Sequence, residues 1–260
     1  MEQTKTTATD LGAGKKIFLL YPPSVIHDEM IDILIMSGFE TYTLLDHKKA
    51  LHILEKFPGS IMFINIDERM SEGEWEGYIR DILENPKTKD TRLGILSYNQ
   101  DRKLMEKYLM HLALPCGYIQ LKLGIQESTK IMINALEANE ARGRRKFIRA
   151  SCEDDPNATM NYKDPGCLFQ GKILDISSAG IAARIKDFFD YPANSMLKEV
   201  QLKLRGALVM SNMVLMGKRK DDLDVQILLF DSARMDRDYK LVIHHYIKLS
   251  LQKYIDSLKI

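Results

Sequence analysis

The hydrophobic residues of the first half fall into short runs, and segments with helical spacing separate these runs. Each run is nearly continuous, which is typical of strands that are covered on both faces. Between the runs, apolar positions recur as on one face of an amphipathic helix. Five such strand–helix units predict a parallel sheet with helices on both faces, an α/β fold. The expected strands are Lys16–Tyr21, Thr41–Leu45, Ser60–Ile66, Arg92–Tyr98 and Tyr118–Leu121.

The pattern changes from helical spacing to strand-like alternation beyond Arg149. In Glu199–Leu204, for example, apolar and polar residues alternate, as in a half-buried strand. Five or six short strands separated by turns predict a small antiparallel barrel. The expected strands are Leu168–Asp175, Ile181–Ile185, Glu199–Leu204, Ala207–Gly217 and Leu223–Leu229, and turns are expected at Glu153–Asn157 and Lys163–Gly166.

A last segment with helical spacing runs to the C-terminus, and Asp236 or Asp238 is placed to cap it. Its apolar face is expected to pack against the barrel or against a second copy of the chain, as in a homodimer. The penultimate helix is expected over Gln126–Ala141, running almost directly into a basic segment. The sequence therefore predicts a leader at residues 1–14, an α/β domain at 15–141 and a barrel domain at 142–260.

Composition narrows the function classes. The net charge is +1, so overall charge predicts neither nucleic-acid nor membrane affinity. No apolar run reaches membrane-spanning length, and residues 1–14 have no apolar signal core, so we expect a disordered leader and a cytoplasmic protein. The three cysteines are not clustered, so neither a disulfide framework nor a zinc site is expected. No catalytic triad, P-loop or metal constellation exceeds chance, so no enzyme is expected.

Two motifs stand out at the start of the second half. Arg142–Arg149 contains four arginines and a lysine in eight residues. Asp175–Gly180 lies where one apolar run stops and another starts. Together they read as R-x-x-x-R, followed 26 positions later by D-x-S-x-x-G. The order and the spacing make the pair much more specific than either motif alone.

This pair resembles the signature of PilZ domains, small β-barrels that bind the bacterial second messenger cyclic di-GMP. The messenger carries two phosphodiester charges and two guanine bases. Arginine suits it because the planar guanidinium binds phosphate bidentately, binds guanine O6 and N7, and stacks on a base. The resemblance implies that Arg145 and Arg149 make these contacts. It also implies that Arg144 adds stacking or a contact to a second ligand molecule.

The resemblance also assigns roles to the second motif. Asp175 would accept a hydrogen bond from a guanine N–H, and the Ser177 hydroxyl would reach a phosphate or a base. Gly180 would allow the close approach and the unusual backbone angles of a turn that lines the ligand. No catalytic residue, metal or further cofactor is implied.

The resemblance thus implies a cyclic di-GMP receptor that signals to a partner protein. We expect Arg142–Arg149 to be mobile without ligand and to be ordered by binding. Because the segment is expected to continue the preceding helix, ordering would change the orientation of the two domains. An unidentified effector of motility, secretion or polysaccharide export would detect this change. The implied partners include neither a nucleic-acid polymer nor an inserted membrane.

The first half resembles the receiver domain of two-component signalling, which has a flavodoxin-like fold. Asp67, Ser97 and Lys122 fall near the positions of the phosphate-accepting Asp, the Ser or Thr and the Lys of a receiver. The receiver's acidic pair is absent, because Tyr21-Pro22-Pro23 stands in its place. Without those carboxylates no Mg²⁺ site forms, so we expect a receiver-like domain that has lost phosphotransfer, with Asp67 as a turn residue.

Two alternatives remain open on the sequence. One is a phosphorylation-responsive regulator in which Asp67 is labelled and the barrel is only a scaffold. The other is nucleic-acid binding through the arginine cluster, which would make affinity fall steeply with salt.

Overall fold

A computed structural model of the chain describes residues 14–164, 166–186 and 188–258. They form two compact units, which are described separately. The first contains the described residues up to Lys146 with Ser257 and Leu258, and the second contains Phe147–Asp256. The division follows Lys146, whereas the sequence placed the domain boundary after Ala141. The expected leader at 1–14 lies outside the described residues, except for Gly14.

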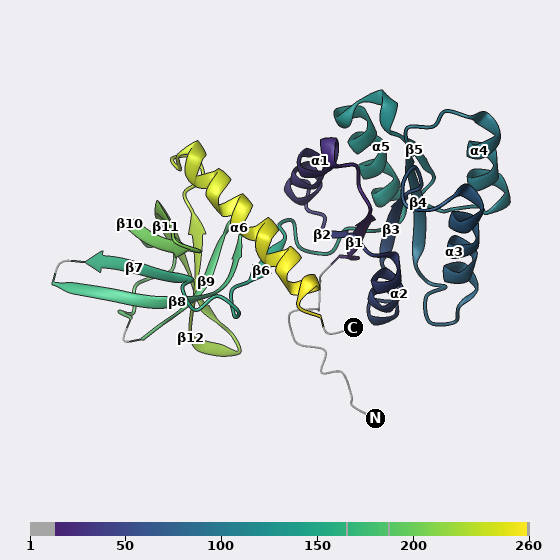
Figure 1. Ribbon diagram of the computed structural model, residues 1–260. Coiled ribbons are helices and arrows are strands. Elements are labelled where there is room, and N and C mark those ends of the chain that lie inside the picture. The colour runs from purple at the N-terminus through teal and green to yellow at the C-terminus, as the bar shows by residue number, and fades with distance from the viewer. Residues whose placement is uncertain (1–13, 165, 187, 259–260) are drawn as a thin grey trace. The chain divides into compact units, whose positions relative to one another are not determined.

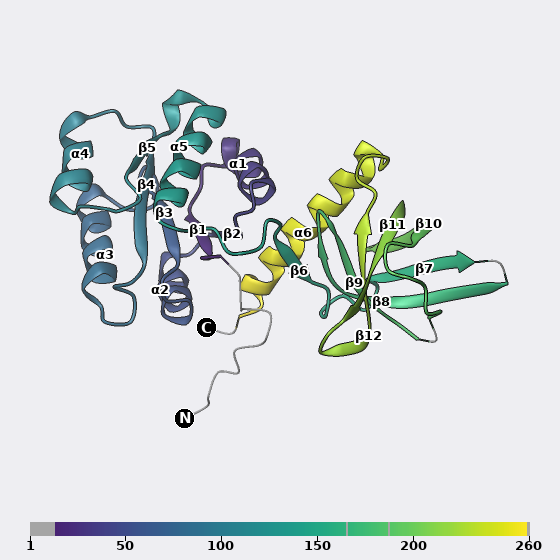
Figure 2. The same ribbon diagram turned by 180° about the vertical axis from the view of Figure 1, so that it is seen from behind.

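The first unit is built on five parallel strands in the order β2-β1-β3-β4-β5, which is the flavodoxin-like order (Figures 1 and 2). The strands are β1 (Ile17–Leu20), β2 (Thr41–Leu44), β3 (Ile61–Asn65), β4 (Arg92–Ser97) and β5 (Tyr118–Gln120). The helices are α1 (Ser24–Met36), α2 (His47–Lys56), α3 (Glu72–Glu84), α4 (Arg102–Glu106) and α5 (Ile125–Ala138). A π turn, η1 (Lys107–His111), continues α4, and a 3-10 turn, η2 (Leu121–Leu123), precedes α5.

The strands at the centre of this sheet are fully buried. Every residue of β1 is buried, and so is every residue of β3. This burial agrees with their continuous apolar sequences and with helices covering both faces. The predicted flavodoxin-like fold of the first half is therefore confirmed.

The last helix of the first unit ends earlier than the sequence predicted. α5 stops at Ala138 instead of Ala141. The Asn139 side chain ends it by donating to the backbone oxygens of Pro115 and Ala135, at 3.0 and 2.8 Å. Glu140 then has a left-handed backbone, with φ of 53°. The basic segment therefore does not continue the helix, and the expectation that it would do so is wrong.

The second unit is a six-stranded antiparallel barrel with one extra strand and a C-terminal helix. The strands are β6 (Arg149–Ser151), β7 (Thr159–Asp164), β8 (Cys167–Ser177), β9 (Gly180–Ile185), β10 (Met196–Leu204), β11 (Ala207–Arg219) and β12 (Asp222–Phe230). Their order is β6-β8-β7-β10-β11-β12-β9, and pairing of β8 with β9 closes the ring. β6 lies outside the ring, paired with β8. The predicted barrel is confirmed, but β6 and β7 were not predicted.

Apolar side chains at alternate positions along the strands fill the interior of the barrel. In β10, Val200, Leu202 and Leu204 are buried, whereas Gln201 and Lys203 are exposed. The side chains of a strand point alternately to the two faces, so the apolar set faces the interior. The long strand β8 follows this alternation until its register shifts between Ile173 and Asp175. Such a bulge re-aims the side chains that follow it.

The C-terminal helix α6 (Arg237–Asp256) packs on β6, β8 and β11. Asp236 caps it by accepting from the Asp238 N–H at 2.8 Å. The buried face consists of Ile243, Tyr246, Ile247, Leu251 and Ile255. This packing confirms the barrel as the surface that covers the helix, and the homodimer stays a prediction. No helix in the described part of the chain has the length and apolar character needed to cross a membrane.

A buried hydrogen bond attaches α6 to the loop after β6. The Tyr246 hydroxyl donates to the Asp155 carboxylate at 3.0 Å, and the Tyr246 side chain is almost completely buried. Burial raises the pKa of Tyr246 above its usual value, so the phenol stays protonated and remains a donor. Burial likewise raises the pKa of the neighbouring Cys152 thiol to about 12. The protonated phenol of Tyr246 therefore joins α6 to the loop after β6.

We predict that Tyr246→Phe weakens this attachment by about 1–2 kcal/mol, because a hydrogen bond to a charged acceptor is lost. The measurement is hydrogen exchange of α6 peptides, since local opening reports local stability. Tyr239→Phe on the same helix is the control, because Tyr239 is not on the buried face. Equal exchange in wild type and Tyr246→Phe would contradict the prediction.

Candidate functional site

The carboxyl edge of the parallel sheet is the place where a receiver domain would carry its phosphorylation site. β3 ends at Asn65, which is 1% exposed and donates through its amide to the Tyr21 backbone oxygen at 2.9 Å. Asp67 comes two residues later, so the position that ends strand three carries an amide. An amide cannot form an acyl phosphate, and Asp67 lies in the turn beyond the strand.

Asp67 instead joins two loops. Its carboxylate accepts from the Ser97 hydroxyl at 2.5 Å and from the Tyr98 N–H at 2.6 Å. Both oxygens are therefore engaged by the residues where β4 ends. Lys122 lies in η2 and is exposed. These contacts agree with the interpretation of Asp67 as a turn residue.

An aromatic cluster occupies the end of β1, where a receiver has its acidic pair. Tyr21 is buried, and its ring packs against Trp75 with centroids 6.1 Å apart. Its hydroxyl lies 3.0 Å from His47 Nδ1. Tyr21 also has a left-handed backbone, with φ of 51°, which brings a bulky side chain into this turn. Among the described residues, no group of three or more His, Cys, Asp or Glu could hold a metal ion.

The basic segment does not behave as one unit. Arg142 donates to the Ser37 backbone oxygen at 2.6 Å and to the Glu137 carboxylate at 2.8 Å, and its guanidinium lies 4.6 Å from the Phe39 ring centroid. These contacts attach Arg142 to the first unit, so its inclusion in the mobile segment is wrong. Arg144 is exposed and Arg145 is half-buried, both at the end of the same unit.

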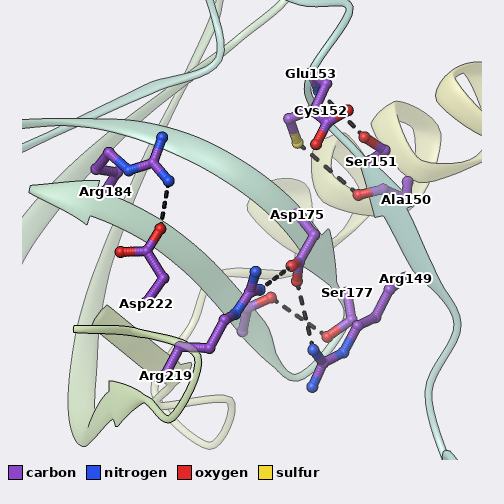
Figure 3. A network of polar contacts seen from close by, with 11 residues as sticks. Arg149, Ala150, Ser151, Cys152, Glu153, Asp175, Ser177, Arg184, Arg219 and Asp222 are labelled. Atoms are coloured by element: carbon purple, nitrogen blue, oxygen red, sulfur yellow. Dashed lines mark hydrogen bonds and ion pairs between the residues drawn. The ribbon is translucent and has the colours of Figure 1, made fainter. Parts of the chain in front are cut away.

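Arg149 and Asp175 come together on the barrel (Figure 3). β6 pairs with β8 so that Arg149 lies opposite Ser177 and Ser151 lies opposite Asp175. The Arg149 guanidinium is 3.6 Å from the Asp175 carboxylate. The structure therefore joins the second arginine of the first motif to the aspartate of the second motif. The two are 26 positions apart in the sequence.

A third residue, Arg219, completes this cluster. It ends β11 and donates to the Asp175 carboxylate at 2.6 Å (Figure 3). The register of β11 against β12 shifts between Leu215 and Gly217 and again between Lys218 and Arg219, and Gly217 has a φ of 127°. These irregularities turn the end of β11, as bulges do. Sequence reasoning missed Arg219, because no local spacing links it to a partner 44 residues away.

The tip of the β11–β12 hairpin has a second attachment. Arg184 on β9 donates to Asp222, the first residue of β12, at 2.5 Å. The hydrogen bond from Arg184 lowers the pKa of Asp222 below its usual value. With Arg219 bound to Asp175, both sides of the turn are held against the β8–β9 surface. The cluster Arg149–Asp175–Arg219 joins two guanidinium groups to one carboxylate and so carries a net positive charge, whereas the charges of Arg184 and Asp222 balance.

Ser177 and Gly180 form the turn between β8 and β9. The Ser177 hydroxyl donates to the Gly180 oxygen and accepts from the Ala179 N–H, both at 3.3 Å, and Ser177 is buried. Gly180 pairs with Leu229, and a Cβ at Gly180 would lie 2.1 Å from the Leu228 oxygen. Gly180 does not have a positive φ. The expected unusual backbone angle at Gly180 is therefore wrong, and its close neighbour in this structure is strand β12.

Comparisons with known proteins give structural likenesses. No protein-family model matches the chain, and no curated protein matches it. Similar solved structures include the PilZ domain with cyclic di-GMP of YcgR from Escherichia coli, at 12% identity and a TM-score of 0.35, over 44% of this chain and 99% of that one.

Two other solved structures are similar to the chain. The Bacillus subtilis inhibitor of motility MotI/DgrA has 12% identity and a TM-score of 0.35, over 46% of this chain and 56% of that one. The Borreliella burgdorferi PlzA protein in complex with cyclic di-GMP has 14% identity and a TM-score of 0.29, over 47% of each chain. Values this low carry no argument for ligand or function.

The packing of Gly180 gives a prediction that is independent of those likenesses. Gly180→Ala should lower the free energy of unfolding of the barrel by at least about 2 kcal/mol, because the new methyl group meets backbone atoms of β12. Chemical denaturation measures the change. Ser178→Ala, in the same turn but exposed, should stay within about 0.5 kcal/mol of wild type. If Gly180→Ala were as stable as Ser178→Ala, the prediction would be wrong, because β12 would then have moved to make room for the methyl group.

The edge of the parallel sheet gives another prediction. Incubation with acetyl phosphate and Mg²⁺ should leave the chain unlabelled, because an amide ends β3 and both Asp67 oxygens are engaged. Intact-mass spectrometry measures the label. Labelling of wild type that disappears in Asp67→Asn would contradict this prediction and support the phosphorylation-responsive alternative.

Proposed function

We propose that the second unit is a receptor for cyclic di-GMP, which binds over the paired β6 and β8 strands. The observation that carries the proposal is the contact between Arg149 and Asp175, at 3.6 Å. This contact brings the second arginine of R-x-x-x-R beside the aspartate of D-x-S-x-x-G, on paired strands of the second unit. A guanidinium beside a carboxylate presents both a phosphate-binding group and an acceptor for a base N–H.

The state of Arg149 supports this role. Its side chain is 42% exposed, and 3.6 Å is too long for a hydrogen bond. An exposed ion pair of this kind contributes little stability in water. A phosphodiester can accept bidentate, charge-assisted hydrogen bonds from the same guanidinium. Exchange of the carboxylate for a phosphate therefore costs the free protein little.

The remaining predicted contacts belong to the proposal. Arg145 contributes the first guanidinium of the R-x-x-x-R motif, and Arg144 adds stacking or a contact to a second ligand molecule. Asp175 accepts from a guanine N–H, and Ser177 reaches the ligand from the β8–β9 turn. Arg144 is exposed, as a stacking residue must be. Arg142 is not included, because it is engaged within the first unit.

The proposed output is a change in the orientation of the two units, detected by an effector protein of motility, secretion or polysaccharide export. Residues 141–148 form neither helix nor strand. Ligand contacts to Arg145 and Arg149 would order the residues between these two arginines. The messenger shifts the equilibrium only by its preference for the ordered state. The proposal assigns the chain no catalytic step.

The test is calorimetric titration of the full chain with cyclic di-GMP. Wild type should show saturable binding at messenger concentrations of tens of micromolar or below. Arg149→Ala should weaken binding about ten- to a hundredfold, because a charge-assisted hydrogen bond contributes about 1.5–3 kcal/mol. Arg145→Ala should weaken it similarly.

Arg234→Ala is the matched control. Arg234 is an exposed arginine of the same unit, and it follows the end of β12 that is opposite to the Arg219 hairpin. It should bind like wild type. Absence of heat for wild type at tens of micromolar messenger, or equal loss in Arg149→Ala and Arg234→Ala, would contradict the proposed site.

A further inference from the structure

We infer that Arg219 is a positioning residue that fixes the Asp175 carboxylate for recognition of guanine. The inference rests on the proposed function, because it concerns how the same site distinguishes one base from another. It adds a residue from a different strand, outside both sequence motifs. The two arginines at Asp175 differ in geometry, and the difference assigns them different roles.

Distances separate the two arginines. Arg219 donates a hydrogen bond to Asp175 Oδ2 at 2.6 Å, whereas Arg149 lies 3.6 Å from Oδ1. Exposure follows the same order, with 28% of the Arg219 side chain exposed and 42% of the Arg149 side chain. The Asp175 side chain is 15% exposed, which strengthens its short hydrogen bond relative to one in water. We therefore expect Arg149 to give up its contact with Asp175 when it binds a phosphate, and Arg219 to keep its hydrogen bond to Asp175.

The backbone holds Arg219 in this place. Arg219 ends β11 directly after a register shift against β12, and Arg184 binds Asp222 on the other side of the hairpin turn. A hairpin tip held at two points limits the movement of Arg219. A hydrogen bond from a fixed donor then limits rotation of the Asp175 carboxylate.

The orientation of the Asp175 carboxylate determines which base it can recognise. Guanine presents two neighbouring donors, the N1–H and the exocyclic N2–H, and a carboxylate can accept from both. Each carboxylate oxygen has two lone pairs, so Oδ2 can keep Arg219 while it accepts from the base. Once Arg149 turns to a phosphate, Oδ1 becomes accessible to the second donor. Hypoxanthine lacks the N2 amino group and would lose one of these hydrogen bonds.

The test compares cyclic di-GMP with cyclic di-IMP, the analogue without the N2 amino groups, by calorimetric titration. Wild type should prefer cyclic di-GMP about tenfold, the value of one hydrogen bond to a charged acceptor. In Arg219→Gln the preference should fall below about threefold, because the carboxylate no longer has a fixed orientation. Arg219→Lys keeps a charged donor and should recover part of the preference. Thermal unfolding checks that each variant is folded.

The outcomes separate this inference from the proposed function. If wild type binds neither nucleotide, the proposed function fails and the inference fails with it. If wild type binds with preference and Arg219→Gln keeps the same preference, only the role of Arg219 is overturned. An equal loss of affinity for both nucleotides in Arg219→Gln and Arg219→Lys would mean that Arg219 contacts a phosphate, which also overturns positioning. Arg234→Gln is the control and should retain the wild-type preference.

Discussion

The second unit depends on one strand, β8, which pairs with three others. Its first part pairs with β7, its second part with β9, and its end with β6. Pairing with β9 closes the barrel, and pairing with β6 brings Arg149 to Asp175. A register slip of one residue would reverse which side chains face the core and which face the proposed ligand surface. Fold and candidate site therefore have a common cause.

The proposed anion site does not require a large net charge on the chain. The net charge of the chain is +1, yet two guanidinium groups converge on a single carboxylate. The local excess of positive charge lies on residues of β6, β8 and β11. The first unit has no comparable cluster of charge at the corresponding edge of its sheet among the described residues. Aromatic rings and an amide occupy the place where a receiver has its acidic pair and its phosphate-accepting carboxylate.

The parts of the fold and of the candidate site that could be predicted are those that show a hydrophobic pattern or a motif within a short stretch of sequence. Continuous apolar runs located the parallel strands, and alternation located β8 to β12. β7 has the same alternation, with Met160 and Tyr162 buried, but turn residues on both sides concealed it. β6 has only three residues, too few to show a period. Arg219 and the bonds that end α5 at Asn139 depend on contacts between distant residues, which no spacing reveals.

The most direct test of the central claim is a crystal structure of the full chain grown with saturating cyclic di-GMP. The account predicts nucleotide density over the β6–β8 surface, with a phosphate against Arg149 and a guanine edge against Asp175. Arg219 should still be bonded to Asp175. An empty β6–β8 surface, or nucleotide bound elsewhere with the Arg149–Asp175 pair intact, would contradict the account.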